Sequence, residues 1–134
     1  MAADLENVVR AAGRALGAGD YEEFLTYLHP DVEFTSMIAE MEGETFRGHE
    51  GVARWWAQVR EAFEEGHWDY QSIEVDGGDG GDDDRGVARL HISGRLGGVP
   101  VSQTMWQAFR GRDGKAVWWR FFRSDAEARA AVGM

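Results

Sequence analysis

The chain has 134 residues, the length of one typical domain, and 43% are hydrophobic, so we expect a single packed domain over residues 1–134. It contains no cysteine, which excludes disulfides, thiolate metal sites and cysteine nucleophiles and favours a cytoplasmic location. The formal net charge of -10 disfavours nucleic acid as a partner. The sequence has no long apolar run and no basic leader, so we expect no membrane span and no secretory signal.

The N-terminal part of the chain carries the spacing of amphipathic helices. Apolar residues recur every three or four positions over 4–16, which predicts a helix with one buried stripe. Asp20 is a candidate N-cap for a second helix. Because a proline disfavours helical geometry in the residue before it, Pro30 should end this helix near Leu28.

A strand and a third helix follow in the predicted order. The apolar pattern predicts a short strand over 32–36 and then a loop over 37–44 that is rich in acids and methionine. A third helix should begin within 46–51 and continue to about Phe63, because apolar residues again recur at helical spacing. Gly66 is the expected end of that helix.

From Trp68 onward the hydrophobic period falls to two, which is typical of strands, and glycine and aspartate occupy the connections. Because strands that follow one another without helices pair antiparallel, we expect a curved antiparallel sheet with the three N-terminal helices packed on one face. The predicted fold class is therefore α+β. The expected strands are 68–75, 86–94, 101–109 and 116–123.

The order of these elements resembles the nuclear transport factor two-like superfamily, and five motifs are similar to its SnoaL-like branch over nearly the whole chain. The motifs are LHPDV at 28–32, FRGHEG at 46–51, GVPV at 98–101, RDGK at 112–115 and DAEA at 125–128. The resemblance implies a cone-shaped, cystatin-like fold, a cavity between sheet and helices, and a homodimer through the outer sheet face. It implies no single activity, because the superfamily includes isomerases, hydrolases, dehydratases, cyclases and binding domains.

This chain lacks the acidic residues that two enzyme types of the superfamily use. The steroid isomerases keep a general-base aspartate at the end of the first strand, where this chain has uncharged residues at 34–37. The SnoaL-like cyclases place an acid on the late sheet. Depending on the register, the inward candidates there are Gln103 and Gln107 or Thr104 and Trp106, and all four are uncharged.

The epoxide hydrolases of the superfamily use an Arg-x-Asp pair, and this chain has Arg89-Leu90-His91 at the similar place. Residues two apart on a strand share a face, so Arg89 and His91 should project together, and a histidine can act as a general base near neutral pH. The other possibility is that this polar pair lies on the exposed or dimer face. In that case Ala88, Leu90 and Ile92 face the core.

Our leading hypothesis is a homodimer that binds a small, largely apolar organic molecule in an aromatic-lined cavity. An alternative is a proton-transfer enzyme of the isomerase, cyclase or hydrolase type, with His91 as base and Arg89 or Tyr27 as electrostatic partner. A further alternative is a structural dimerisation domain whose own side chains fill the interior. We expect no cofactor, and no metal because the four histidines lack ligand spacing. The candidate lining residues are Tyr27, Trp56, His91, Gln103 and Trp106.

Overall fold

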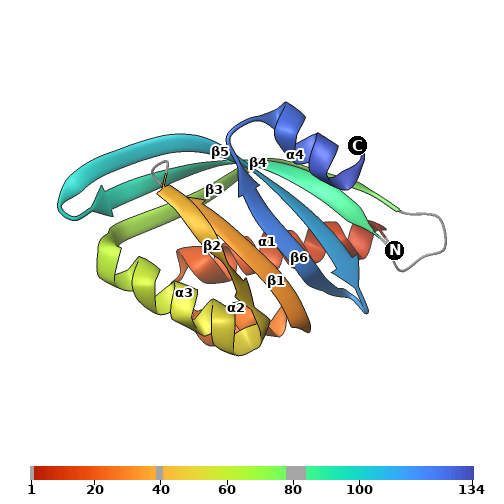
Figure 1. Ribbon diagram of the computed structural model, residues 1–134, viewed down its shortest axis with the longest axis horizontal. Coiled ribbons are helices and arrows are strands. Elements are labelled where there is room, and N and C mark those ends of the chain that lie inside the picture. The colour runs from red at the N-terminus through yellow and green to blue at the C-terminus, as the bar shows by residue number, and fades with distance from the viewer. Residues whose placement is uncertain (1, 39–40, 78–83) are drawn as a thin grey trace.

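The structure is a computed structural model that describes residues 2–38, 41–77 and 84–134. Within these residues six strands form one curved sheet, in the spatial order β2-β1-β6-β5-β4-β3 (Figure 1). In chain order the elements are α1 (Ala2–Gly17), α2 (Tyr21–Thr26), β1 (Leu28–Ile38), β2 (Met41–Arg47), α3 (Gly48–Ala62), β3 (Phe63–Asp76), β4 (Arg85–Leu96), β5 (Val99–Arg112), β6 (Lys115–Phe122) and α4 (Asp125–Val132).

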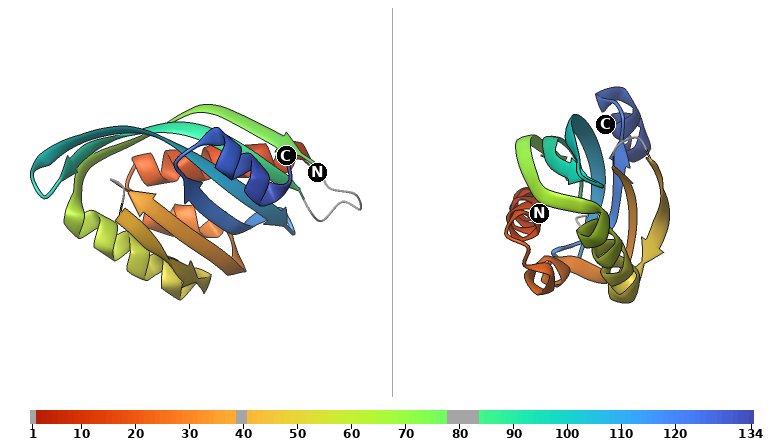
Figure 2. Two further views of the ribbon diagram at one scale, coloured as in Figure 1. Left: turned by 45° about the horizontal axis from the view of Figure 1, so that its top comes forward. Right: turned by 90° about the vertical axis from the view of Figure 1, so that its left-hand side faces the viewer.

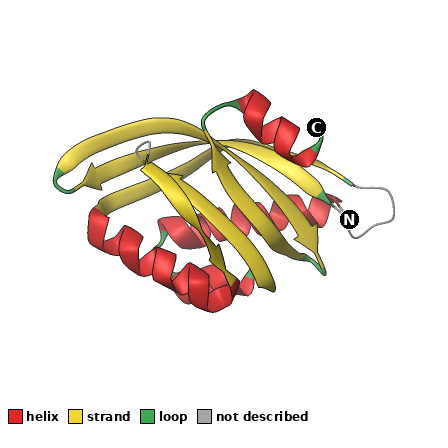
Figure 3. Cartoon of the chain, viewed as in Figure 1, coloured by secondary structure: helices red, strands yellow, loops and turns green. Residues whose placement is uncertain are grey.

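The helices lie on both sides of the sheet, as Figure 2 shows. The N-terminal helices α1, α2 and α3 pack on the concave side, which we call the inner face, while α4 lies on the opposite, outer face (Figure 3). The α+β class and the covering of one face by three early helices are therefore as predicted. In the described part of the chain, no helix is long and apolar enough to cross a membrane.

The first two helices follow their sequence signals. In α1 the predicted stripe is buried, with Val9 and Ala12 fully inaccessible beneath the helix. Asp20 caps α2, because its carboxylate oxygen accepts a hydrogen bond from the backbone N–H of Glu23 at 3.1 Å. The helix ends at Thr26, and Pro30 lies in the strand that follows.

Two predictions about the sheet were wrong. The expected loop over 37–44 contains the start of β2, which pairs antiparallel with β1. The sheet is also mixed rather than wholly antiparallel, because β1 pairs parallel with β6. Pattern rules favour pairing between strands that are neighbours in sequence, whereas β1 and β6 are separated by α3 and four strands.

The predicted end of the third helix was also wrong. Helix α3 ends at Ala62, and Gly66 lies inside β3 rather than beyond a helix terminus. The pairing of β3 with β4 shifts register between Glu64 and His67, so Gly66 lies at a β-bulge. Glycine inside a strand commonly marks such a bulge, which explains why this residue was misinterpreted as a helix terminator.

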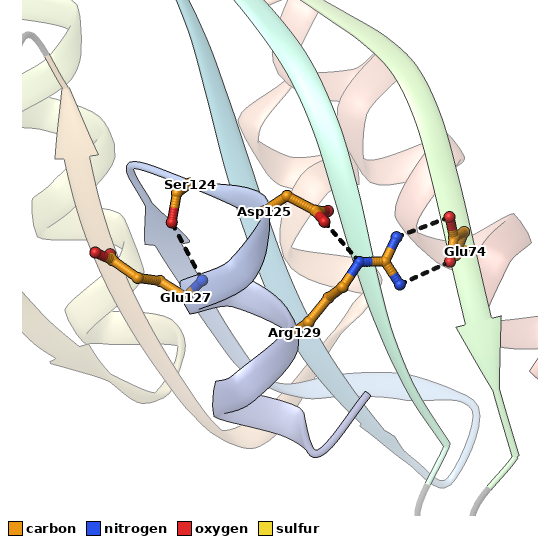
Figure 4. A network of polar contacts seen from close by, with 5 residues as sticks. All are labelled: Glu74, Ser124, Asp125, Glu127 and Arg129. Atoms are coloured by element: carbon orange, nitrogen blue, oxygen red, sulfur yellow. Dashed lines mark hydrogen bonds and ion pairs between the residues drawn. The ribbon is translucent and has the colours of Figure 1, made fainter.

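Helix α4 was not predicted as an element, and arginine contacts hold it on the outer face (Figure 4). Ser124 caps its first turn by accepting a hydrogen bond from the backbone N–H of Glu127 at 3.2 Å. Arg129 binds Glu74 of β3 through two hydrogen bonds of 2.8 and 3.0 Å, and its Nε donates to Asp125 at 2.8 Å. A further arginine, Arg85, donates to the carbonyl of Val132 at 3.0 Å.

Candidate functional site

Aromatic rings build the interior between the inner face and the helices. Phe34 of β1 lies 4.5 Å from Trp55 of α3, measured between ring centroids. Trp68 of β3 reaches the same cluster, with its ring centroid 6.2 Å from that of Trp55 and 6.2 Å from that of Phe121. A ligand that entered this region would meet apolar and aromatic surfaces, which suit a largely apolar molecule.

A polar pair lies within this apolar interior. Gln107 of β5 is 1% exposed, and its Oε1 accepts a hydrogen bond of 2.7 Å from the hydroxyl of Tyr70. The amide nitrogen Nε2 of Gln107 has no hydrogen-bond partner among the residues that the structure describes, and neither has Nε1 of Trp119 on the neighbouring strand. Both atoms are buried N–H donors, and in most proteins such donors have a hydrogen-bond partner.

Small neighbours allow this pair to form. Gln107 lies directly opposite Ala88 on β4, while Tyr70 lies opposite Leu90, one step along the inner face. The short side chain of Ala88 leaves room for the tyrosine to reach across the sheet. The ring of Tyr70 also lies against Gly13 of α1, where an added Cβ would stand 2.3 Å from Cε2 of the ring.

Burial extends the pH range over which the hydroxyl of Tyr70 stays protonated. Desolvation raises the pKa of Tyr70 well above the usual tyrosine value, and the hydrogen bond to Gln107 offsets only part of this rise. The phenol is therefore a neutral hydrogen-bond donor throughout the physiological pH range. Because the partner in this bond is a carboxamide, neither member of the pair carries a charge.

The structure divides the six predicted site residues between the two faces of the sheet. Trp56 packs in the inner core and stacks on Tyr21, and Tyr27 packs against the same core at the junction of α2 and β1. Gln103 lies opposite the buried Ile92, and therefore on the inner face. These three residues lie on the side where a cavity was expected.

Arg89, His91 and Trp106 lie on the outer face, so the prediction that His91 and Trp106 line one cavity together with the inner residues was wrong. The side chains of a strand alternate between faces, and Leu90, which separates Arg89 from His91, is fully buried in the inner core. Trp106 instead packs against the outer cluster beneath α4. The second possibility for this strand, with Ala88, Leu90 and Ile92 toward the core, is therefore the observed one.

The outer pair has chemistry of its own. Arg89 and His91 share a face, as predicted, and His91 Nε2 lies 2.8 Å from the hydroxyl of Ser102 on β5. Its other ring nitrogen, Nδ1, lies 3.5 Å from the hydroxyl of Thr104. Across the described ranges, no group of three or more His, Cys, Asp or Glu side chains is arranged to hold a metal ion.

Sequence reasoning missed the buried pair as a functional unit. Gln107 was considered only as a position where related cyclases carry an acid, and Tyr70 was not considered. A signal was present for both residues. Side chains two residues apart on a strand share a face, so Tyr70 should lie on the face of Trp68 and Gln107 on the face of Gln103. This spacing groups the residues, but it does not say which face is the inner one.

Comparison with known protein families identifies the family of this chain. A model of the SnoaL-like domain matches residues 9–119, which is most of the sequence. The chain belongs to the SnoaL-like domain family. The resemblance drawn from the motifs is thereby confirmed, and this SnoaL-like domain has the expected relation to nuclear transport factor two-like folds. Among curated proteins no match to the chain is found.

Solved structures share the fold of this SnoaL-like domain at low sequence identity. TerC, co-crystallised with polyporic acid, has a TM-score of 0.75 at 20% identity, covering 98% of this chain and 99% of that chain. A hypothetical protein from Catenulispora acidiphila with a ketosteroid isomerase-like fold, in complex with trimethylamine, has a TM-score of 0.72 at 19% identity, covering 95% and 92%. An LEH-like epoxide hydrolase from M. tuberculosis has a TM-score of 0.71 at 15% identity, covering 98% and 90%. At these identities the comparison establishes the fold alone.

Proposed function

We propose that this SnoaL-like domain binds a small, largely apolar organic molecule between the inner face of the sheet and helices α1 and α3. One observation carries the proposal: the buried amide of Gln107 has an unpartnered Nε2 in an aromatic interior. An unsatisfied buried donor costs about 1–3 kcal/mol, so a ligand that accepts a hydrogen bond from it would recover that energy on binding. Tyr27, Trp56 and Gln103 remain candidate lining residues.

The neighbours with bound compounds support the class of ligand but not its identity. TerC was crystallised with polyporic acid and the Catenulispora acidiphila protein with trimethylamine. These two molecules are chemically unlike each other, yet both are small organic compounds. In this chain the interior around Gln107 is aromatic and uncharged, which suits a small, largely apolar molecule.

Native mass spectrometry of the gently purified protein, beside its denatured mass, tests this proposal. We expect extra mass on the native protein, and loss of that mass in Gln107→Leu, which keeps the side-chain size but removes the amide. Gln58→Leu makes the same chemical change at an exposed position of α3 and should retain the ligand. A native protein without added mass, whose melting temperature also stays constant across a panel of aromatic compounds, would contradict the proposal.

A second candidate function rests on the contact between His91 and Ser102. The 2.8 Å separation of His91 Nε2 from the Ser102 hydroxyl is the geometry of a base beside a proton donor. In this proposal His91 is the base and Arg89 the electrostatic partner of a proton-transfer reaction on the outer face. Turnover of a substrate should be lost in His91→Ala, and unchanged turnover in that variant excludes the proposal.

We also propose that the outer face of the sheet forms a homodimer interface and that the protein is cytoplasmic. Trp106 and Phe122 lie opposite each other on this face and are only partly buried within one chain. Such an aromatic pair is suited to a subunit contact. The native mass spectrum reports the subunit count directly. A dimer without ligand, and with an interior filled by its own side chains, would instead favour a structural dimerisation domain.

A further inference from the structure

We propose that Gln107 recognises a carbonyl or similar acceptor oxygen of a neutral ligand, and that Tyr70 and Gly13 are positioning residues that aim its amide. This inference deepens the proposed small-molecule function and rests on it. It assigns a hydrogen-bonding role to each end of the amide. It also gives Gly13 of α1 a role in selectivity although that residue has no side chain.

The direction of the hydrogen bond defines what the ligand must offer. The hydroxyl of Tyr70 donates to Oε1 of Gln107, so the acceptor end of the amide is already engaged. The remaining end, Nε2, can only donate. Trp119 adds a second unpartnered donor, Nε1, on the same inner face of β6. A ligand that presents an acceptor oxygen satisfies such donors, whereas a pure hydrocarbon does not.

The surroundings of Gln107 select against charge. Among the described residues, the buried polar or charged ones are Ser36, Asp84 and Gln107. Asp84 directly precedes β4, and its backbone carbonyl accepts a hydrogen bond from the backbone N–H of Gly111. The residues opposite Gln107 on the two neighbouring strands are Ala88 and Phe121. An ionised ligand would lose its hydration energy here, and no opposite charge is present in this part of the described structure to compensate for that loss. The matching ligand is therefore a neutral molecule with an acceptor oxygen, such as a ketone, quinone or ester.

Gly13 explains how Tyr70 keeps its place. Glycine inside a helix is less favourable than alanine, so its presence in α1 calls for a packing reason. That reason is the ring of Tyr70, whose Cε2 and Cδ2 would stand 2.3 and 2.7 Å from a Cβ at position 13. An alanine there would push the ring off the helix and the hydroxyl away from Gln107. The amide would then be free to rotate and would lose its fixed donor direction.

Matched pairs of compounds that differ only by a carbonyl test the inference: 9-fluorenone with fluorene, and the smaller 1-indanone with indane. Titration followed by tryptophan fluorescence gives the ratio of the two affinities for each pair. We expect the wild-type protein to prefer the ketone by roughly 3- to 10-fold, the typical net worth of one hydrogen bond. In Gln107→Leu the ratio should fall to about one while hydrocarbon affinity is retained. Gln58→Leu is the control and should keep the wild-type ratio.

The positioning role has its own variants. Tyr70→Phe should lower the ketone preference while hydrocarbon affinity stays unchanged, a split that general damage to the fold would not produce. Gly13→Ala should lower the ratio in the same way. If Gly13→Ala does not fold, the double variant Gly13→Ala with Tyr70→Leu removes the clashing ring and should fold with a ratio of about one. A wild-type ratio in Tyr70→Phe overturns the positioning role.

The outcomes separate this inference from the function on which it rests. Equal binding of ketone and hydrocarbon by the wild-type protein overturns the recognition of a carbonyl but leaves small-molecule binding intact. Failure of all four compounds to bind overturns both proposals for neutral aromatic ligands. A ketone preference that survives in Gln107→Leu assigns recognition to another group and also overturns the inference.

Discussion

The two faces of the same strands carry different kinds of polar group. On the inner face the half-buried Tyr70 and the buried Gln107 form a neutral pair among aromatic rings. On the outer face His91 and Ser102 form a hydrogen-bonded pair near solvent, with Arg89 exposed on the same face. A hydrogen bond contributes more to selectivity where water cannot compete for the partners. The comparison therefore favours the inner face for the proposed ligand discrimination and the outer face for the proposed association or proton transfer.

The largest expected effect comes from truncating an inner aromatic residue. Phe34 is 1% exposed and packs against Trp55 and Trp119, so Phe34→Ala should destabilise the protein by about 3–5 kcal/mol. Phe122→Ala is the matched control, because this ring lies on the outer face, is partly exposed and packs beneath Arg120. Urea unfolding of both variants checks the expectation. Equal losses of stability would show that the two faces do not differ in packing as the structure indicates.

Helix α4 explains why the sequence predicted the residues of the inner face only in part. A strand with one face in water alternates between apolar and polar residues, which fixes its orientation. On β4 and β5 the outer face is also apolar where α4 covers it, at Val87, Trp106 and Ala108. Both faces then look buried, and the choice between Gln107 and Trp106 as the inward residue could not be made from the pattern. Where α4 does not reach, the alternation of Ala88, Leu90 and Ile92 with polar residues was informative.

The elements that depend on distant partners were the ones that periodicity missed. Helix α1 and strands β4 to β6 were predicted to within a few residues, because each carries its own pattern. Strand β3 begins at Phe63, well before its predicted start at Trp68. The pairing of β1 with β6 depends on the whole chain, and no local pattern encodes it. Helix α4 did have a local signal, the capping sequence of Ser124 and Glu127, but its few apolar residues form too short a stripe to stand out.

An intermediate effect is expected at alkaline pH, and it probes the inner pair alone. Burial raises the pKa of Tyr70, so the folded state keeps the phenol proton at a pH where the unfolded state, with a pKa of about 10, has lost it. Stability is therefore fully present below pH ~10 and declines above it, by roughly 1.4 kcal/mol per pH unit, until the folded-state pKa is reached.

Tyr70→Phe should flatten this alkaline decline, because the variant has no proton to lose at that site. Urea unfolding between pH 9 and pH 11 compares the slopes of the two proteins. The difference between their ultraviolet titrations reports the ionisation of Tyr70 itself. A decline of equal slope in both proteins would mean that the hydroxyl is not held in a dry interior, and would remove the physical basis for a neutral recognition site.

The smallest effect is expected on the outer face, where the contact between Glu74 and Arg129 helps to hold α4. The hydrogen bonds from Arg129 lower the pKa of Glu74, so this contribution to stability is present above the ordinary glutamate value of 4.5 and is lost as the pH falls below it. Glu74 is 57% exposed, so water and salt screen the pair. Arg129→Lys retains the charge but not the two parallel hydrogen bonds, and it should shift the acid unfolding midpoint slightly upward at low salt and not at 1 M salt. Ala128 and Val132 are both fully buried against the sheet, which indicates that apolar packing holds α4 more than this contact does. A large shift that persists in high salt would mean that the contact dominates instead.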